Sequence, residues 1–136
     1  MKLSEVIRRA IPLSKATCDY WEVEKPKRHP KYPFIQPGED DGPPPPEQVQ
    51  LKELLDGLSD EDVYRLQLLI ECGRWEFGPD KFAKELQEIK ESASAKLLAA
   101  VMGDDLDLWM QLEYGLDQMN KHGIDVDATF PVAKSA

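Results

Sequence analysis

The chain has 136 residues, the size of a single domain, and its 41% apolar and 32% charged residues allow a folded core. Its formal charge of −9 argues against a general nucleic-acid-binding protein. No apolar run approaches the roughly 20 residues that cross a bilayer, and two cysteines are too few for a disulfide-rich secreted scaffold.

The first predicted element is an amphipathic helix in residues 1–23. Its apolar face follows intervals of four, three, four and three residues, at Val6, Ala10, Leu13, Thr17 and Tyr20. Pro12 lies inside this pattern and lacks the N–H that an unbroken helix needs. We therefore expect a helix that is kinked at Pro12, or two short helices that meet there.

The N-terminus does not resemble a secretory signal. Charged side chains at Lys2, Glu5, Arg8 and Arg9 occupy the positions where such a signal needs an apolar stretch. We therefore expect a cytoplasmic protein with both cysteines reduced.

Residues 24–46 form a proline-rich segment that contains eight of the eleven prolines. Because proline disfavours helix in the residue before it, we expect a long loop or linker that ends in a short polyproline II rod at residues 43–46. The basic residues 25–31 of this segment lie among aromatic residues. Rings that pack back onto the helices, or a loop that binds a protein, fit this mixture better than single-stranded nucleic acid does in an acidic chain.

Residues 47–123 are predicted to form a bundle of short helices. Expected helix starts are marked by Ser59, by Pro79, by Ser92 or Ser94, and by Asp104 or Asp105. Expected helix ends are marked by Gly73, Gly103 and Gly123. We expect a flexible tail in residues 124–136.

The fold class follows from these elements. No stretch alternates apolar and polar residues long enough to indicate a β-sheet. The sequence therefore predicts an all-α protein, a compact bundle of about five or six short helices with a long proline-rich loop after the first helix.

Three features occur together within residues 51–118: the helix start Leu58-Ser-Asp-Glu61, the turn Gly73-Arg74 and the closing helix segment Leu112-Glu-Tyr-Gly-Leu116. This combination resembles a family of small bacterial proteins known only as a domain of unknown function. The resemblance implies a helical fold and a bacterial, cytoplasmic setting. It implies no activity and no catalytic residues.

The sequence nominates no catalytic, cofactor-binding or metal-ligating residue. Residues 125–129 match the Asp-x-Asp-x-Thr string of the haloacid-dehalogenase phosphatases, but they follow a helix end instead of a buried strand. The two histidines, His29 and His122, do not form a closely spaced ligand pair, and neither cysteine has a histidine near it in sequence.

The function that we favour is a non-enzymatic domain that binds another protein or a second copy of itself. The candidate contact residues are two loop aromatics and a group between predicted helices: Tyr32, Phe34, Arg74, Trp75 and Phe77. Trp75 and Phe77 could instead cover the end of the core. The alternative function is an acidic inhibitor or antagonist that masks a basic, nucleic-acid-binding protein, because residues 47–136 carry nine Lys and Arg against nineteen Asp and Glu.

Overall fold

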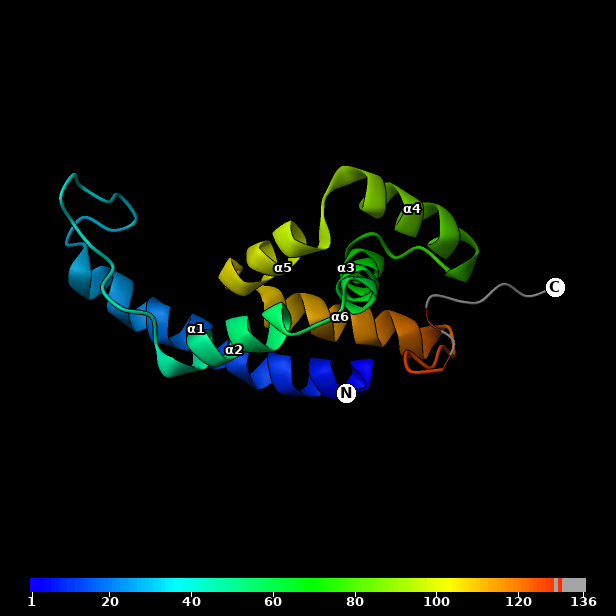
Figure 1. The fold of residues 1–136 in the computed structure, drawn as a ribbon. Coiled ribbons are helices and arrows are strands. Elements are labelled where there is room, and N and C mark those ends of the chain that lie inside the picture. The colour runs from blue at the N-terminus through cyan, green and yellow to red at the C-terminus, as the bar shows by residue number, and fades with distance from the viewer. Residues whose placement is uncertain (129, 131–136) are drawn as a thin grey trace.

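Helices α3 and α6 cross at the centre of the molecule, as the computed structural model shows (Figure 1). The structure describes residues 1–128 and 130. Across these residues it consists of six α-helices and one 3₁₀ turn, without a strand, so the all-α prediction is confirmed. The elements are α1 (Leu3–Arg28), α2 (Pro46–Asp56), α3 (Asp60–Trp75), η1 (Pro79–Lys81), α4 (Phe82–Ser92), α5 (Ala95–Asp104) and α6 (Leu108–Lys121).

The core lies where α3 and α6 meet the remaining helices. α3 packs against α4, α5 and α6, while α1 packs against α2 and α6. All six helices contribute buried side chains to this core, including Phe82 and Ile89 of α4 and Met102 of α5. The buried side chains of the six helices therefore face one common interior.

Two glycines allow α3 and α6 to approach closely. A Cβ atom placed on Gly73 would lie 2.5 Å from the backbone nitrogen of Gly115, and one placed on Gly115 would lie 2.5 Å from the carbonyl oxygen of Leu69. The prediction that Gly73 ends its helix is wrong, because Gly73 lies within α3 at this crossing. The helix ends at Trp75, and Glu76 takes the left-handed conformation, with φ of 55°.

α1 is a single helix of 26 residues that passes through both Pro12 and Pro26. The alternative of two short helices is therefore wrong, and the predicted end near Val23 lies five residues too early. Each proline removes one backbone hydrogen bond. This loss is offset because α1 buries side chains along most of its length, from Leu3 to Trp21. The loop after α1 consequently spans residues 29–45, not 24–46.

The start of α2 also differs from the prediction by one residue. Pro46, expected in a polyproline rod, is the first residue of α2, a position where its fixed φ fits and its missing N–H has no partner to lose. The backbone of Pro45, with φ of −68° and ψ of 158°, keeps the polyproline II conformation.

The first part of the predicted flexible tail is packed. Val126 and Phe130 are buried, and both of their backbone carbonyls accept hydrogen bonds from the Arg65 guanidinium. The prediction of a flexible tail is wrong for these residues because their apolar side chains complete the core beside Phe82. Residues 129 and 131–136, the rest of that prediction, lie outside the described residues.

None of the helices in the described part of the chain combines the length and the apolar character that crossing a membrane requires.

Candidate functional site

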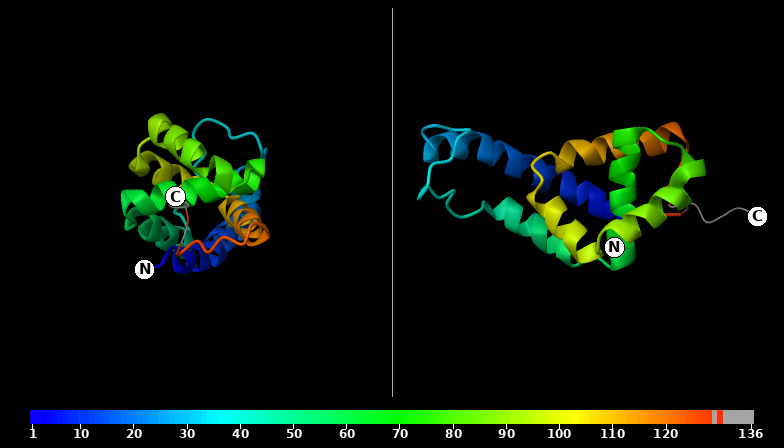
Figure 2. Two further views of the ribbon diagram at one scale, coloured as in Figure 1. Left: turned by 90° about the vertical axis from the view of Figure 1, so that its right-hand side faces the viewer. Right: turned by 90° about the horizontal axis from the view of Figure 1, so that it is seen from above.

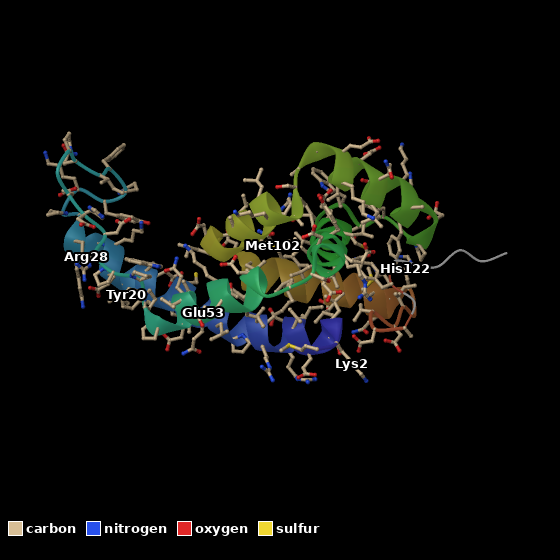
Figure 3. The ribbon with its side chains drawn as sticks, viewed as in Figure 1. Lys2, Tyr20, Arg28, Glu53, Met102 and His122 are labelled. Carbon is tan, nitrogen blue, oxygen red and sulfur yellow. The ribbon has the colours of Figure 1, made fainter. Side chains whose placement is uncertain are left out.

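The loop of residues 29–45 lies at one end of an elongated molecule. α1 runs beyond the other helices, the loop reverses the direction of the chain, and α2 leads back toward α3–α6 (Figures 1 and 2). Arg28 marks this end of the molecule, and His122 lies at the opposite end (Figure 3). We refer to residues 20–50 as the arm and to α3–α6 with the first part of α1 as the body.

Trp21 joins the two helices of the arm. Its indole Nε1 donates a hydrogen bond of 2.8 Å to Oε1 of Gln48 in α2, and the ring itself is buried. Within α1, Tyr20 contacts the Trp21 ring edge-on at 4.9 Å between centroids, and the Lys25 Nζ lies 5.2 Å from the Trp21 ring centroid. The hydrogen bond between Trp21 and Gln48 joins α1 to α2 where both leave the body.

His29 ends α1 and closes the base of the loop. Its side chain is only 1% exposed, and its two ring nitrogens each face a carboxylate. Nε2 lies 2.5 Å from Oδ1 of Asp41, and Nδ1 lies 3.2 Å from Oε1 of Glu39. The Lys25 ammonium lies 3.0 Å from the other oxygen of Asp41. We refer to Lys25, His29, Glu39 and Asp41 as the His29 cluster.

The groups of the His29 cluster shift the pKa values of His29 and Asp41. The hydrogen bond to Asp41 raises the pKa of His29, and the hydrogen bond to Glu39 raises it further, although desolvation opposes both. The same contact with His29, together with Lys25, lowers the pKa of the Asp41 carboxyl. The cluster therefore favours a charged imidazolium between two charged carboxylates.

The His29 cluster leaves an apolar tip exposed. Tyr32, Phe34 and Ile35 are 48%, 73% and 51% exposed, respectively, and follow the buried His29 within six residues. Short turns shape this segment: the backbone N–H of Tyr32 donates to the carbonyl of His29, and that of Phe34 donates to the carbonyl of Lys31. The structure thus places the predicted contact residues Tyr32 and Phe34 next to Ile35, which the sequence analysis did not select. We refer to Tyr32, Phe34 and Ile35 as the tip.

The second group of predicted contact residues lies on the body, at the end of α3 and beyond it. Trp75 is 68% exposed, and the exposed Arg74 donates a hydrogen bond of 3.4 Å to Gln111 of α6. Phe77 is buried against Phe82, with 6.0 Å between the ring centroids. Phe77 is therefore a core residue and not an accessible contact. Its prediction as a contact residue is corrected because the left-handed Glu76 turns the chain inward between Trp75 and Phe77.

The five predicted contact residues consequently do not form one surface. Two belong to the tip at the end of the arm, two are exposed on the body, and one lies in the core. The tip is the group that lies in the same loop as the His29 cluster.

The two cysteines lie in surroundings that disfavour the thiolate. Burial raises the pKa of the Cys72 thiol to about 11, and its Sγ lies 3.3 Å from the carbonyl oxygen of Phe77. Burial and the nearby Glu22 carboxylate raise the pKa of Cys18. Among the described residues, no group of three or more His, Cys, Asp and Glu side chains is arranged to hold a metal ion.

A groove lies between α1 and α2. It is lined by Arg8, Arg9, Pro12, Leu13, Gln50, Glu53 and Leu54. The guanidinium of Arg9 lies 3.4 Å from the carboxylate of Glu5, and Glu53 faces the groove from α2. Because these carboxylates offset the positive charge of the arginines, the groove is not a marked anion site.

Comparisons of the chain with protein families, with curated proteins and with solved structures found no match. The resemblance of residues 51–118 to a family of uncharacterised bacterial proteins therefore stays a prediction.

The sequence pattern does not reveal His29 as a structural centre. By its spacing, His29 is a histidine without a second histidine close enough to form a metal-ligand pair. The available signal was the pair of carboxylates at Glu39 and Asp41, ten and twelve residues further along. Gly38 and Gly42, which both have positive φ here, allow the chain to return those carboxylates to the end of α1.

Proposed function

We propose that this protein binds another protein through the tip of its arm. The observation that supports this proposal is the exposure of Tyr32, Phe34 and Ile35 directly beside the buried His29. Apolar side chains that are scattered singly over a surface need no explanation, but three within four residues at the end of a projecting arm do.

The shape of the tip indicates the kind of partner. The loop that carries the tip projects from the end of α1 (Figure 1), so the matching surface on the partner is a concave apolar site. An aromatic side chain that enters such a site buries up to about 150–250 Å² of surface, and aromatic residues are enriched among those that dominate binding energies.

The anchoring of the loop favours binding energetically. Ordering a side chain at an interface costs about 0.5–1.5 kcal/mol, and a loop that is ordered before binding avoids part of this cost. The His29 cluster and the Trp21–Gln48 hydrogen bond supply that order without using the tip residues themselves. A rigid base with an exposed apolar end is the arrangement that a contact site requires.

The test is photo-crosslinking from the tip. A full chain that carries benzoylphenylalanine in place of Phe34 should crosslink to a defined protein, and mass spectrometry of the product should map the crosslink to an apolar site on it. Two further variants, Tyr32→Ser and Phe34→Ser, should each reduce capture of that same protein by at least about tenfold, the effect of removing one hot-spot contact worth more than about 1.4 kcal/mol.

Tyr114→Ser is the matched control, because Tyr114 is 54% exposed on α6, in the body, close to the exposure of Tyr32. Its capture of the partner should equal that of the unmodified chain. Equal capture by all three serine variants would contradict the proposal. A crosslink to a second copy of the chain would identify self-association as the form that binding takes.

A further inference from the structure

We infer that His29 is a pH-sensitive latch, which holds the tip in its ordered position while the imidazole is protonated and releases it on deprotonation. This inference concerns the regulation of the site described above and rests on the proposed function for its biological meaning. Its physical basis is the geometry of the His29 cluster, which exists whether or not a partner binds.

Both ring nitrogens of His29 need a proton in the observed arrangement. A carboxylate only accepts hydrogen bonds, and each nitrogen faces one: Nε2 faces Asp41 at 2.5 Å, and Nδ1 faces Glu39 at 3.2 Å. A neutral imidazole carries a proton on one nitrogen alone, so its other lone pair would point at a carboxylate oxygen. The observed geometry is therefore that of the imidazolium.

The balance of charge leads to the same conclusion. With His29 protonated, the cluster holds two positive groups, His29 and Lys25, and two negative groups, Glu39 and Asp41. Deprotonation of His29 leaves one negative charge of the two carboxylates uncompensated. That charge lies beside the His29 side chain, which is only 1% exposed.

The described charged groups on neighbouring elements are engaged in pairs of their own. On α1, the Arg28 guanidinium lies against Gly42 of the loop and is paired with Glu24 at 3.3 Å. At the end of α5, Asp104 lines the same small cleft as Lys25 and Asp41, and it is itself paired with Lys52 at 2.7 Å. In the loop, Asp40 adds a further negative charge and accepts a hydrogen bond from the N–H of Gly42.

The direction of the pH dependence follows from the pKa of His29, which is raised in the folded chain, chiefly by the Asp41 hydrogen bond. A raised pKa means that the protonated latch stabilises the folded loop at and below the usual histidine pKa. This contribution is lost as the pH rises through the raised pKa of His29. The latch is thus closed at mildly acidic pH and opens on the alkaline side of the usual histidine range.

Glu39 connects the latch to the tip. The shorter contact, between Nε2 and Asp41, retains its proton, so Nδ1 is the nitrogen that becomes an acceptor and repels Glu39. The same oxygen of Glu39 accepts a hydrogen bond of 2.8 Å from the backbone N–H of Gln36, the residue after the tip. When Glu39 moves away from His29, the turn that holds Gln36, and with it Ile35, loses its anchor.

The experiment is an NMR titration of the full chain from about pH 5 to about pH 9, which spans the range where histidine changes charge. The ring signals of His29 give its protonation. Backbone ¹³C shifts of residues 31–41, recorded with carbon detection so that amide exchange does not hide them, report the order of the loop. We expect the loop shifts to move toward random-coil values with the same midpoint as the His29 ring, and that midpoint to lie above the usual histidine pKa.

Two histidine variants make the result specific. His29→Gln, which carries no titrating group, should show loop shifts close to those of the alkaline unmodified chain at every pH, and its helical circular dichroism checks that the body is folded. His122→Gln removes the exposed histidine at the opposite end of the molecule and should leave the loop transition unchanged (Figure 3). Loop shifts that stay constant while His29 titrates would overturn the latch.

Partner capture by the Phe34→Ser variant, compared with the titration, separates the latch from the proposed function. If the loop follows His29 but the Phe34→Ser variant captures the partner as well as the unmodified chain does, the latch stands and the proposed function fails. If Phe34→Ser abolishes capture but the loop ignores the titration, the proposed function stands and the latch fails. If both stand, capture should decline on the alkaline side with the His29 midpoint.

Discussion

Asp127 supplies the beginning of α1 with a cap that the helix lacks in its own sequence. Lys2 precedes the helix and makes no side-chain cap, whereas the two oxygens of Asp127 accept hydrogen bonds from the backbone N–H of Ser4 at 2.9 Å and from its hydroxyl at 2.5 Å. A carboxylate at this position also interacts favourably with the helix dipole. Asp127, which is far from α1 in sequence, thus caps the first turn of this helix.

Replacing Asp127 with alanine should lower the free energy of unfolding by about 1 kcal/mol at neutral pH, the usual effect of losing an N-terminal helix cap. The effect should depend on pH, because the hydrogen bonds from Ser4 lower the pKa of Asp127. A lowered pKa means that the contribution is present above the usual aspartate pKa and is lost as the pH falls through the lowered value. Urea unfolding of both proteins at about pH 7 and about pH 3 measures the difference.

Asp117, exposed on α6, provides the matched control for this substitution. Asp117→Ala should cause no loss of stability that disappears in acid. The assignment of Asp127 as a cap is wrong if the difference between Asp127→Ala and the unmodified chain is the same at both pH values.

The residue that ends α3 illustrates what the sequence could not indicate. A left-handed residue at a helix end is most often glycine, so Gly73 was the natural choice. The structure places Glu76 in that conformation and uses Gly73 for helix packing. The exposure of Trp75 and the burial of Phe77 depend on this three-residue shift, which the helical periodicity of α3 does not encode. Tyr32 and Phe34 were predicted from the mixture of basic and aromatic residues, which does not indicate the contacts of His29 with Glu39 and Asp41 at the base of the same loop.

Among the helices, α3 and α6 pack against each other at the centre of the core. At Gly73 an added Cβ would meet backbone atoms of Gly115 and Tyr114 within 3 Å, and backbone cannot move aside as the end of a side chain can. The two helices would have to separate, which would disturb the buried leucines of both.

Gly73→Ala should therefore destabilise the protein, even though alanine favours helix over glycine by about 1 kcal/mol. Overpacking of a dense core costs about 1–3 kcal/mol, so we expect a net loss and a lower Tm in thermal unfolding. The control is Gly57→Ala at the end of α2, where the added Cβ would lie 3.4 Å from the nearest atom, the carbonyl oxygen of Glu53, and φ is −80°. A Gly73→Ala protein as stable as the Gly57→Ala protein would mean that the helices do not cross this closely.

Local signals predicted the helix starts better than the helix ends. Ser59 and Ser94 each accept a hydrogen bond from the backbone N–H three residues on, as the capping patterns indicated. The start of α6 differs, because the predicted cap Asp105 accepts from the N–H of Asp107 in the turn before the helix. The end of α1 was predicted too early because proline statistics describe isolated segments. Such statistics do not include tertiary contacts, such as the hydrogen bond of Trp21 to Gln48 and the contact of His29 with Asp41.

At the scale of the whole molecule, charge is distributed unevenly along the sequence. Residues 1–46 carry eight Lys and Arg against seven Asp and Glu, a net charge of +1, whereas residues 47–136 carry a net charge of −10. The arm contains the exposed tip, and the acidic residues belong chiefly to the body. The two functions considered from the sequence therefore use different parts of the molecule: apolar recognition uses the arm, and antagonism of a basic protein uses the body.

Salt separates these two functions. Between about 0.1 M and about 0.5 M salt, the screening of surface charges becomes much stronger, while burial of apolar surface is not weakened. We expect the affinity of the partner identified by crosslinking to change less than about threefold over this range, measured by calorimetry with the purified proteins. The Phe34→Ser variant should bind more weakly at both salt concentrations. An affinity that falls by one or more orders of magnitude at high salt, with no effect of Phe34→Ser, would assign binding to the acidic body and favour the antagonist over recognition by the tip.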